Sequence, residues 1–597
     1  MSVVKGLVAG RILEEQLFPY PRLLEKDREV LGAMLDAIDE FLAPHQADFK
    51  RWDRDAAQPA EFIQGLRDLG LFGLIIPEAY GGIGLSNGAY ARVLGQTSSH
   101  DSSATLTIGA HSSIGMKGLL LFGTEEQKAR YLPKLASGGM IAAFCLTESA
   151  SGSDAASIRT RAHKNEDGSW TLNGEKIWIT NGGIADLYTV FARTSGADGK
   201  ITAFIVEAAW PGVSHGPHED KMGIRASSTT TVSFADVRIP ASNVLDQEGK
   251  GFKVAMAILN NGRTGLGGGA VGGMKTLVAM ASEQAKTRKQ FGQPIGEFGL
   301  IREKIAQMTV DCFAAESAVF MVAHYIDSGH EDYSIEAAIS KIFASEALQR
   351  AAYDALQIAA GSGFMRDYPF EQVTRDCRIL TIFEGTNEVL RLYIALSALK
   401  ELSRSLGVLK AAVDDIFNSP IKGFGVLTDY AERRLTRATG VGRDKILAPM
   451  PAALRPAADV YERYTVELSR ACEALLRKFG KSIADQQLQL KRIADIAIDL
   501  YVGLCVTSRA AALANAAGQA DAAEQGSGAA SAAPQSVRAV PMKAEAEQAV
   551  AIAQMFARQA KRRIAGNLRR LERNEDAEMN RLAGFILDKG RYPWDVM

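Results

Sequence analysis

One acidic residue, Glu384, stands where a general base could work. It follows the apolar residues Ile382 and Phe383 and precedes Gly385. A carboxylate that is partly buried by such neighbours has a raised pKa, and it therefore becomes a stronger base towards an acidic carbon–hydrogen bond. The alternative is structural: Glu384 would simply precede a helix whose first turn is capped by Thr386.

Two segments could hold a flat polar cofactor. Phe144–Asp154 is a hydroxyl-rich loop with a glycine, and it offers several hydrogen-bond donors at close range. In the second segment, Trp178 and Thr180 lie two residues apart on a predicted strand and therefore share one face. An aromatic plate beside a hydroxyl suits a heteroaromatic ring. The alternatives are a capped turn for the first segment and a core tryptophan with a solvated threonine for the second.

Glycines indicate two further places of close backbone approach. Gly361 and Gly363 in Gln357–Phe364 would let the backbone approach a phosphate, or Gly361 would simply end a helix. The run Gly267–Gly272 matches the dinucleotide pattern G-x-G-x-x-G, which has meaning only between a strand and a helix. Both flanks of this run have a helical pattern, so we interpret its glycines as small residues for close helix packing.

The elements that must position these residues change along the chain. Residues 28–142 have a helical pattern. From about residue 142 the period becomes that of strands, and Asn173-Gly174 between 169–172 and 175–180 predicts a type I′ hairpin. Further strands are expected at 187–193, 201–207 and 230–240.

Helical periodicity returns after these strands. Residues 301–319 and 335–356 carry the apolar faces of two long helices, which predict a bundle. Helical patterning resumes near residue 457, and 544–573 forms a last helix that is basic on one face. The stretch 518–540 is rich in alanine, glycine, serine and glutamine, and we expect a flexible linker there.

The expected fold is α+β and mostly α, because a length of 597 residues is too much for one compact core. We predict a helical N-terminal domain, a central β-barrel-like domain, a helical bundle and an accessory helical C-terminal domain. Their expected bounds are 1–142, 143–246, 247–400 and 401–597.

Composition excludes several classes of protein. The chain has 68 Lys+Arg and 69 Asp+Glu, a net charge of −1, so it has no global charge for nucleic-acid binding. Its five cysteines are widely spaced without a C-x-x-C pattern, which argues against a disulfide framework, and we expect no metal site. We find no signal or transit segment and no apolar run that approaches ~18–20 residues, which predicts a cytoplasmic location or one at the inner face of a membrane.

The family that this chain resembles is indicated by four segments taken together and in chain order, and it is the acyl-CoA dehydrogenase family. The segments are Phe144–Asp154, Lys176–Gly183, Gln357–Phe364 and Ile382–Asn387. Thr147–Asp154 resembles the family pattern T-E-x-x-x-G-S-D, and Gln357–Phe364 resembles Q-x-x-x-G-x-G-F. The closest subfamily looks like the very-long-chain enzymes and their assembly-factor paralogue. The segments that carry this likeness are Phe18–Pro21, Ala142–Glu148, Ser153–Thr160, Ile258–Arg263 and Ile382–Asn387. The resemblance is strong to about Lys400 and continues more weakly to the C-terminus.

The resemblance implies FAD, lying between the β-domain and the bundle. Thr147 would bond the pyrimidine edge of the isoalloxazine ring, Trp178 would pack on the ring, and Thr180 would lie near N5. Arg288 would hold the pyrophosphate, partly across to a neighbouring subunit. The implied cofactor-binding set is Phe144, Cys145, Leu146, Thr147, Gly152, Ser153, Trp178, Ile179, Thr180, Arg288, Phe291, Gln357, Ile358, Ala359, Ala360, Gly361, Thr386, Asn387 and Glu388. Ala360 departs from the family, which often has a second glycine there, and we expect FAD binding to survive this change.

The resemblance also implies that Glu384 removes the α-proton of an acyl-CoA thioester while the β-hydride passes to the flavin. The thioester carbonyl would accept hydrogen bonds from the Glu384 backbone N–H and from a ribityl hydroxyl, which stabilise the developing enolate. The implied substrate-binding set is Ser153, Asn260, Arg263, Phe383, Gly385 and Gly109. Gly109 stands where medium-chain relatives carry a larger polar residue, which implies a deeper tunnel for long acyl chains.

An electron-transfer flavoprotein as acceptor and a homodimer are the implied partners. Residues 421–450 mix basic and apolar side chains, which suits either peripheral contact with an anionic membrane or a solvated helix face. Three alternatives stay open: an assembly scaffold for a respiratory complex with residual activity, an acyl-CoA oxidase, and a nucleic-acid-associated homologue. Basic residues within 561–573 would suit the last, but nearby acidic residues and the net charge oppose it.

Overall fold

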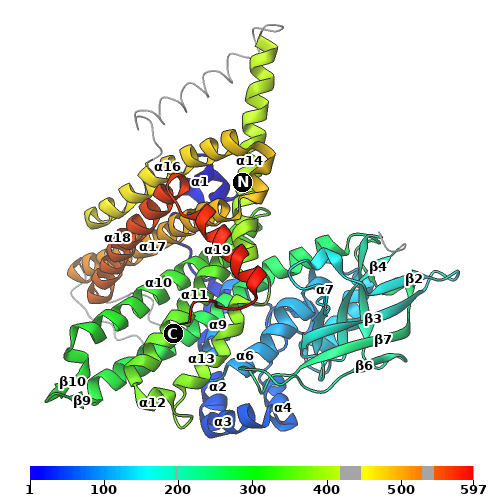
Figure 1. The fold of residues 1–597 in the computed structure, drawn as a ribbon. Coiled ribbons are helices and arrows are strands. Elements are labelled where there is room, and N and C mark those ends of the chain that lie inside the picture. Colours follow the sequence, from blue (N-terminus) through cyan, green and yellow to red (C-terminus); the bar gives the residue numbers. More distant parts are fainter. Residues whose placement is uncertain (195–198, 417–444, 527–542, 596–597) are drawn as a thin grey trace. The chain divides into compact units, whose positions relative to one another are not determined.

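The protein is described by a computed structural model that covers residues 1–194, 199–416, 445–526 and 543–595 (Figure 1). It forms two compact units. One contains Tyr20–Asn387, and the other contains Met1–Pro19, Glu388–Asp521 and Met542–Met597. Residues 1–19, which we expected within the N-terminal helical domain, therefore group with the C-terminal helices. The reason is that helix α1 (Val3–Val8) packs against α16 (Arg455–Phe479) and buries valines and a leucine on all sides.

The first part of the larger unit is helical, as predicted. It consists of α2 (Glu25–Leu42), α3 (Gln46–Asp55), α4 (Ala60–Asp68), α5 (Asn87–Ser98), α6 (Ser102–Gly109), the π-helical turn η4 (Ala110–Gly115), α7 (Lys117–Phe122) and α8 (Glu125–Ala136). Local capping explains several starts: Asp101 accepts from Ala104 N–H, and Thr124 and Gln127 form a reciprocal capping box.

The predicted central β-domain is confirmed as one mixed sheet. Its strands are β1 (Ala142–Cys145), β2 (Arg161–Lys164), β3 (Trp170–Thr180), β4 (Leu187–Thr194), β5 (Ile201–Glu207), β6 (Val213–His215), β7 (Thr229–Ile239) and β8 (Val244–Leu245). Their order is β6-β7-β3-β2-β4-β5-β8, and β1 pairs in parallel with β4. Figure 1 shows the long strands β3 and β7 side by side, which is their antiparallel pairing.

The predicted hairpin at Asn173-Gly174 is wrong, because β3 runs through both residues without reversing. The register against β7 shifts between Leu172 and Gly174, so the pair forms a bulge. Asn173 Nδ2 donates to Asp236 Oδ1 over 2.9 Å and fixes this bulge. Gly174 has a φ of +149°, and a Cβ there would lie 2.5 Å from Thr160 Oγ1. The glycine thus serves a close approach of two strands rather than a turn.

The predicted bundle follows the sheet. It contains α9 (Gly251–Thr287), α10 (Gly299–Asp327), α11 (Ser334–Ala359), the short α12 (Gly361–Phe364), α13 (Phe370–Cys377) and the start of α14 (Asn387–Ile416). The short strands β9 (Lys289–Gln290) and β10 (Gln293–Pro294) connect α9 to the 3-10 turn before α10. Figure 1 shows α9, α10 and α11 as long neighbouring helices, and they pack on one another.

The glycines of the G-x-G-x-x-G run lie within α9 and allow it to pack closely on α5. A Cβ at Gly268 would lie 2.3 Å from Ala91 O, and one at Gly272 would lie 1.9 Å from Gly95 O. The interpretation of these glycines as packing residues is therefore confirmed.

The C-terminal unit contains α16, α17 (Gln487–Gly526), α18 (Lys543–Glu572) and α19 (Asp576–Lys589). Residues 518–526 of the predicted linker are helical, so the linker prediction is wrong there, because alanine-rich sequence continues α17. Its remainder, 527–540, lies outside the described residues, as does 421–444 of the predicted membrane-contact segment. Helix α18 matches the predicted last helix, whereas α19 was not predicted.

Among the described residues, two helices are long and apolar enough to cross a membrane by length and composition, although charged residues interrupt both. They are Gly299–Asp327 and Gln487–Ala520. Within the most apolar window of each, 67% and 83% of the residues are buried inside the protein. Burial to this degree is typical of core helices.

Candidate active site

Glu384 lies in a tight turn between α13 and α14. The 3-10 turn Arg378–Thr381 follows α13, and α14 begins at Asn387. Glu384 has a φ of +54° and Gly385 a φ of +91°. A residue with a side chain rarely adopts this left-handed backbone, and such a conformation costs about 1–3 kcal/mol unless its surroundings hold it.

Side chains from two bundle helices hold this turn. Lys341 Nζ, from α11, donates to Gly385 O over 2.8 Å and to Asn387 Oδ1 over 2.9 Å. From α9, Arg263 Nη2 donates to Glu384 O over 3.4 Å, and its Nη1 donates to Asn260 Oδ1 over 2.6 Å. The structure therefore brings together Glu384, Gly385 and Asn387 with Asn260 and Arg263.

The carboxylate of Glu384 is poised to act as a base. The residue is half-buried as a whole, but its Oε2 is buried and has no hydrogen-bond partner in the described part of the chain. Burial raises the pKa of Glu384, while the positive charges of Arg263 and Lys341 oppose this shift. A carboxylate with a raised pKa and an unused oxygen can accept a proton from a substrate.

The loop after β1 is fixed by a buried ion pair. Lys176 Nζ donates to Glu148 Oε1 over 2.7 Å and to Leu146 O over 3.1 Å. Glu148 Oε1 also accepts from Thr160 N–H, and Ile177 N–H donates to Thr147 O, each over 3.0 Å. Burial alone would raise the pKa of Glu148, but the charge of Lys176 and the hydrogen bonds from Lys176, Thr160 and Arg159 together outweigh it, so the pKa lies below its usual value. Thr147 is therefore held beside β3 as a half-buried residue.

Trp178 is not a core residue, since 62% of it is exposed. Its φ is +57°, and the pairing of β3 with β7 is irregular between Lys176 and Ile179. This irregularity turns the indole outward, while Ile179 is buried and Thr180 is half-buried. An exposed aromatic plate, a neighbouring hydroxyl and the anchored Thr147 loop fit a flat heteroaromatic group such as the ring of FAD.

Other predicted cofactor residues lie on exposed segments. Gly152 and Ser153 are exposed in the loop after Thr147, Arg288 is exposed at the C-terminal end of α9, and Phe291, between β9 and β10, is 94% exposed. At the end of α11, Gln357, Ala360 and Gly361 are exposed, whereas Ile358 and Ala359 are buried. Within the described residues, no hydrogen bond joins these groups to Glu384 or Trp178.

The remaining predicted residues are distributed around these groups. Phe144 is half-buried, Cys145 and Leu146 are buried, Phe383 and Thr386 are half-buried, and Glu388 is exposed. Ala360 adopts a φ of +54°, which explains why a glycine would suit this position better. Gly109 is buried at the end of α6, and a Cβ there would meet Leu94 Cδ1 at 3.7 Å, an ordinary contact.

Four buried residues beside the predicted site were not identified from the sequence: Glu148, Lys176, Lys341 and Tyr90. Lys176 and Glu148 were passed over although a lysine between strand residues signals a paired charge. Lys341 stands between Ile339 and Ile342 in an apolar helix, and this lone charge could have indicated a buried cation with a partner. Tyr90 on α5 is also buried, and the charge of Glu384 adds to the burial that raises the pKa of its hydroxyl.

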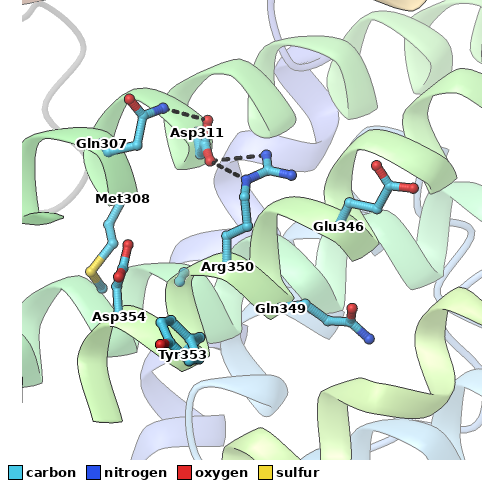
Figure 2. Close-up of a pocket in the computed structure, with 9 residues that line it drawn as sticks. Gln307, Met308, Asp311, Glu346, Gln349, Arg350, Tyr353 and Asp354 are labelled. Atoms are coloured by element: carbon cyan, nitrogen blue, oxygen red, sulfur yellow. Dashed lines mark hydrogen bonds and ion pairs between the residues drawn. The ribbon is translucent and has the colours of Figure 1, made fainter. Parts of the chain in front are cut away.

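A cavity of about 390 Å³ lies elsewhere, between α10 and α11 (Figure 2). Arg350 Nε donates to Asp311 Oδ2 across it over 3.0 Å, and Gln307 Nε2 donates to Asp311 Oδ1 over 3.0 Å. None of the predicted site residues lines it. We therefore place the candidate site at the Glu384 turn, where the reactive groups are, and not in this cavity. The described residues contain no group of three or more histidine, cysteine or acidic side chains placed to hold a metal ion.

Comparisons with known proteins agree along most of the chain. Residues 26–139, 143–237 and 249–399 match the N-terminal, middle and C-terminal domains of acyl-CoA dehydrogenase, and residues 452–527 match the ACAD9/ACADV C-terminal domain. The chain is 44% identical over 521 residues to the very long-chain specific acyl-CoA dehydrogenase of Homo sapiens, covering 85% of this chain and 78% of that protein.

Two solved structures show the same likeness in three dimensions. An acyl-CoA dehydrogenase complexed with FAD from Bacillus anthracis has a TM-score of 0.78 and 30% identity, covering 99% of this chain and 96% of that one. A chain from the electron transferring flavoprotein structure of Acidaminococcus fermentans has a TM-score of 0.60 and 37% identity, covering 63% of this chain and 98% of that one. The protein is therefore a member of the acyl-CoA dehydrogenase family.

Proposed function

We propose that this protein oxidises long or very long acyl-CoA thioesters to trans-2-enoyl-CoA in fatty acid β-oxidation, with Glu384 as the base. Membership of the family makes it an FAD-dependent oxidoreductase that acts on the CH–CH group of acyl-CoA. The observation that carries the proposal is the buried Oε2 of Glu384, which has no hydrogen-bond partner among the described residues and lies in a turn that two bundle helices hold.

The chemistry follows from this environment. Because burial raises the pKa of Glu384, its carboxylate is a better acceptor for the α-proton of a thioester than an exposed glutamate would be. The α-carbon is acidified when its carbonyl oxygen is hydrogen-bonded, and the backbone N–H of Glu384 is the group we assign to that bond. Arg263 and Asn260, joined to each other beside the turn, are assigned to the CoA portion.

FAD, when bound, supplies the acceptor for the β-hydride. Thr147, Trp178 and Thr180 would hold the flavin ring, and Arg288 with Gln357–Gly361 would hold the pyrophosphate of a neighbouring subunit's cofactor. The exposure of Arg288, Gln357 and Gly361 supports a homodimer, because a second subunit can reach these residues. The exposed face of Trp178 and the anchored Thr147 loop are the features that favour this placement.

Two features support a preference for long acyl chains. Gly109 leaves room at the end of α6, where an added Cβ would make only an ordinary contact with Leu94. The region 452–527 matches a domain that is named for the very-long-chain subfamily, and the Homo sapiens relative is named very long-chain specific. The preference is tested by comparing rates on octanoyl-, palmitoyl- and longer acyl-CoAs, where a maximum at the shortest chain would contradict it.

An electron-transfer flavoprotein is the electron acceptor that we propose, with the likeness to a chain of the Acidaminococcus fermentans structure as support.

We place the protein in the cytoplasm or at the inner face of a membrane, with residues 421–450 as the segment for peripheral contact. Flotation with liposomes, with and without 421–450, tests that contact. Peroxide release during turnover distinguishes the alternative of an acyl-CoA oxidase.

Reduction of the bound flavin by acyl-CoA in the absence of oxygen tests the assignment of the base. The wild-type protein is expected to bleach, and Glu384→Gln is expected to keep FAD and stay yellow. A Glu384→Gln protein that retains FAD and bleaches at the normal rate would refute it.

A further inference from the structure

We propose that Lys341 is a positioning residue for the base, because it holds the Glu384–Asn387 turn and brings a buried positive charge to it. The inference rests on the proposed role of Glu384. It adds a residue to the reaction that lies on a different element, α11, and that has no place in the predicted cofactor or substrate sets.

Lys341 brings a buried positive charge to the turn. Its side chain is fully buried and lies in α11 between Ile339 and Ile342. A buried ammonium group is costly unless it is paired and hydrogen-bonded. Two of its bonds go to the turn, one to the backbone oxygen of Gly385 and one to the side-chain oxygen of Asn387. Gly385 and Asn387 follow Glu384 closely in the chain, so these two hydrogen bonds fix the backbone that carries the base.

The same face of α11 holds the far end of the turn. Asn387 Nδ2 donates to Ser345 Oγ and to Glu346 Oε1, each over 3.1 Å. Ser345 and Glu346 lie about one helical turn after Lys341, so a single rigid helix sets the position of Asn387. Glu346 is also one of the residues around the cavity in Figure 2. The left-handed backbone at Glu384 and Gly385 persists because this contact network surrounds it.

Two charges and one neutral hydroxyl, from three different helices, influence the Glu384 carboxylate. Arg263 on α9 and Lys341 on α11 are positive, and Tyr90 on α5 is a buried hydroxyl. Burial raises the pKa of Glu384, and the two cations limit that rise. Loss of the Lys341 charge therefore raises the pKa of Glu384 further, because less positive charge opposes the effect of burial. The base is then protonated over a wider range of pH.

Three variants separate the charge of Lys341 from its hydrogen bonds. Lys341→Met removes both, Lys341→Gln removes the charge and keeps a donor, and Lys341→Arg keeps both. The rate of anaerobic flavin reduction by palmitoyl-CoA is measured against pH in the FAD-loaded protein. The carboxylate infrared band that Glu384→Gln lacks is titrated in parallel, which reports the pKa of Glu384 without turnover.

The acid limb is the part of the rate profile in which the reduction rate falls as pH is lowered. In Lys341→Met we expect it to move to higher pH by about one unit, the smaller end of the effect of a neighbouring opposite charge. The limiting rate of this variant at high pH is expected to fall by roughly 10- to 100-fold, because the base is no longer held in place. Lys341→Gln should show the same shift of the acid limb with a smaller loss of rate. Lys341→Arg should titrate like the wild type.

A matched control is Lys117→Met. Lys117 is another buried lysine, on α7, whose pKa burial lowers to about 8, and its loss should leave the acid limb in place. If the Lys341 variants titrate and react like the wild type while Glu384→Gln is inactive, the role of Lys341 is overturned and the base assignment stands. If Glu384→Gln itself is reduced normally, the base assignment fails instead. If Lys341→Met fails to bind FAD, the test is the comparison of Lys341→Gln with Lys341→Arg. A difference between the acid limbs of these two variants supports the proposal, and identical acid limbs overturn it.

Discussion

Lys176 Nζ lies 2.7 Å from Glu148 Oε1, and the side chain of the lysine is completely buried. The same ammonium group donates to Leu146 O, so the ion pair supports both neighbours of Thr147. A core charge on β3 thus fixes the loop that we assign to the flavin ring. The ion pair thereby holds the proposed cofactor-binding loop in a fixed position relative to β3, the strand that carries Trp178.

Removal of one partner of this pair is expected to be costly. Lys176→Met should lower the free energy of unfolding by about 3–5 kcal/mol, because Glu148 stays buried with an uncompensated charge. Urea unfolding followed by circular dichroism measures the loss. The double variant Glu148→Gln/Lys176→Met should recover part of it, and a single variant within ~0.5 kcal/mol of the wild type would show that the pair is not structurally important.

The neutral variant Glu384→Gln is expected to be more stable than the wild type at neutral pH. The pKa of Glu384 is raised in the folded state, so the folded protein binds this proton more tightly than the unfolded chain does. The wild type therefore loses stability as pH rises from the ordinary glutamate pKa through the raised one, and glutamine avoids this loss. Thermal unfolding at neutral and acidic pH measures the difference, which should shrink on acidification. A less stable variant at neutral pH would contradict the raised pKa.

Close packing of α9 on α5 depends on particular glycines. Gly272→Ala should destabilise the protein by about 2 kcal/mol or more, since its Cβ would lie 1.9 Å from Gly95 O. Gly269→Ala is the matched control in the same helix, because its Cβ would meet nothing closer than Thr105 Cγ2 at 3.5 Å. This control should be neutral or gain up to ~1 kcal/mol from helix propensity. Equal unfolding curves for the two variants would refute the packing role.

A larger side chain at Gly109 should shorten the preferred substrate. Gly109→Gln is expected to lower the rate on palmitoyl-CoA relative to octanoyl-CoA by roughly 10-fold or more, the scale of discrimination that a few methylene groups produce. Gly109→Ala serves as the control, because its Cβ fits at 3.7 Å from Leu94. Steady-state rates on the two substrates measure the ratio, and an unchanged ratio would remove Gly109 from the acyl tunnel.

Much of this architecture could be predicted because periodicity is a local signal. The change from helical to strand pattern near residue 142, the return to helices, and the packing glycines of α9 all follow from neighbouring residues. The hairpin prediction at Asn173-Gly174 was wrong because the same dipeptide suits a bulge as well as a hairpin. Only its contacts with Asp236 and Thr160 distinguish the two structures.

The parts of the site that could not be predicted depend on long-range contacts. The family motifs locate Glu384, Trp178 and Thr147, but the outward turn of Trp178 comes from an irregular pairing with β7 that no motif encodes. Lys341 and its acceptor Gly385 are 44 positions apart in the sequence. The role of Lys341 can therefore be recognised only when the structure places α11 beside the Glu384 turn. The packing of α1 on α16 is likewise a contact between segments that lie far apart in the sequence.

The central claim is that Glu384 is the base of an FAD-dependent acyl-CoA dehydrogenation. It is tested most directly by adding palmitoyl-CoA anaerobically to the purified yellow protein and to its Glu384→Gln variant, and by following the flavin absorption band. The wild type is expected to bleach rapidly. In a variant with the same FAD content, the rate is expected to be lower by roughly 1,000-fold or more, the upper part of the range for loss of a general base. A variant that retains FAD and bleaches like the wild type, or a wild-type protein that takes up no FAD, would contradict it.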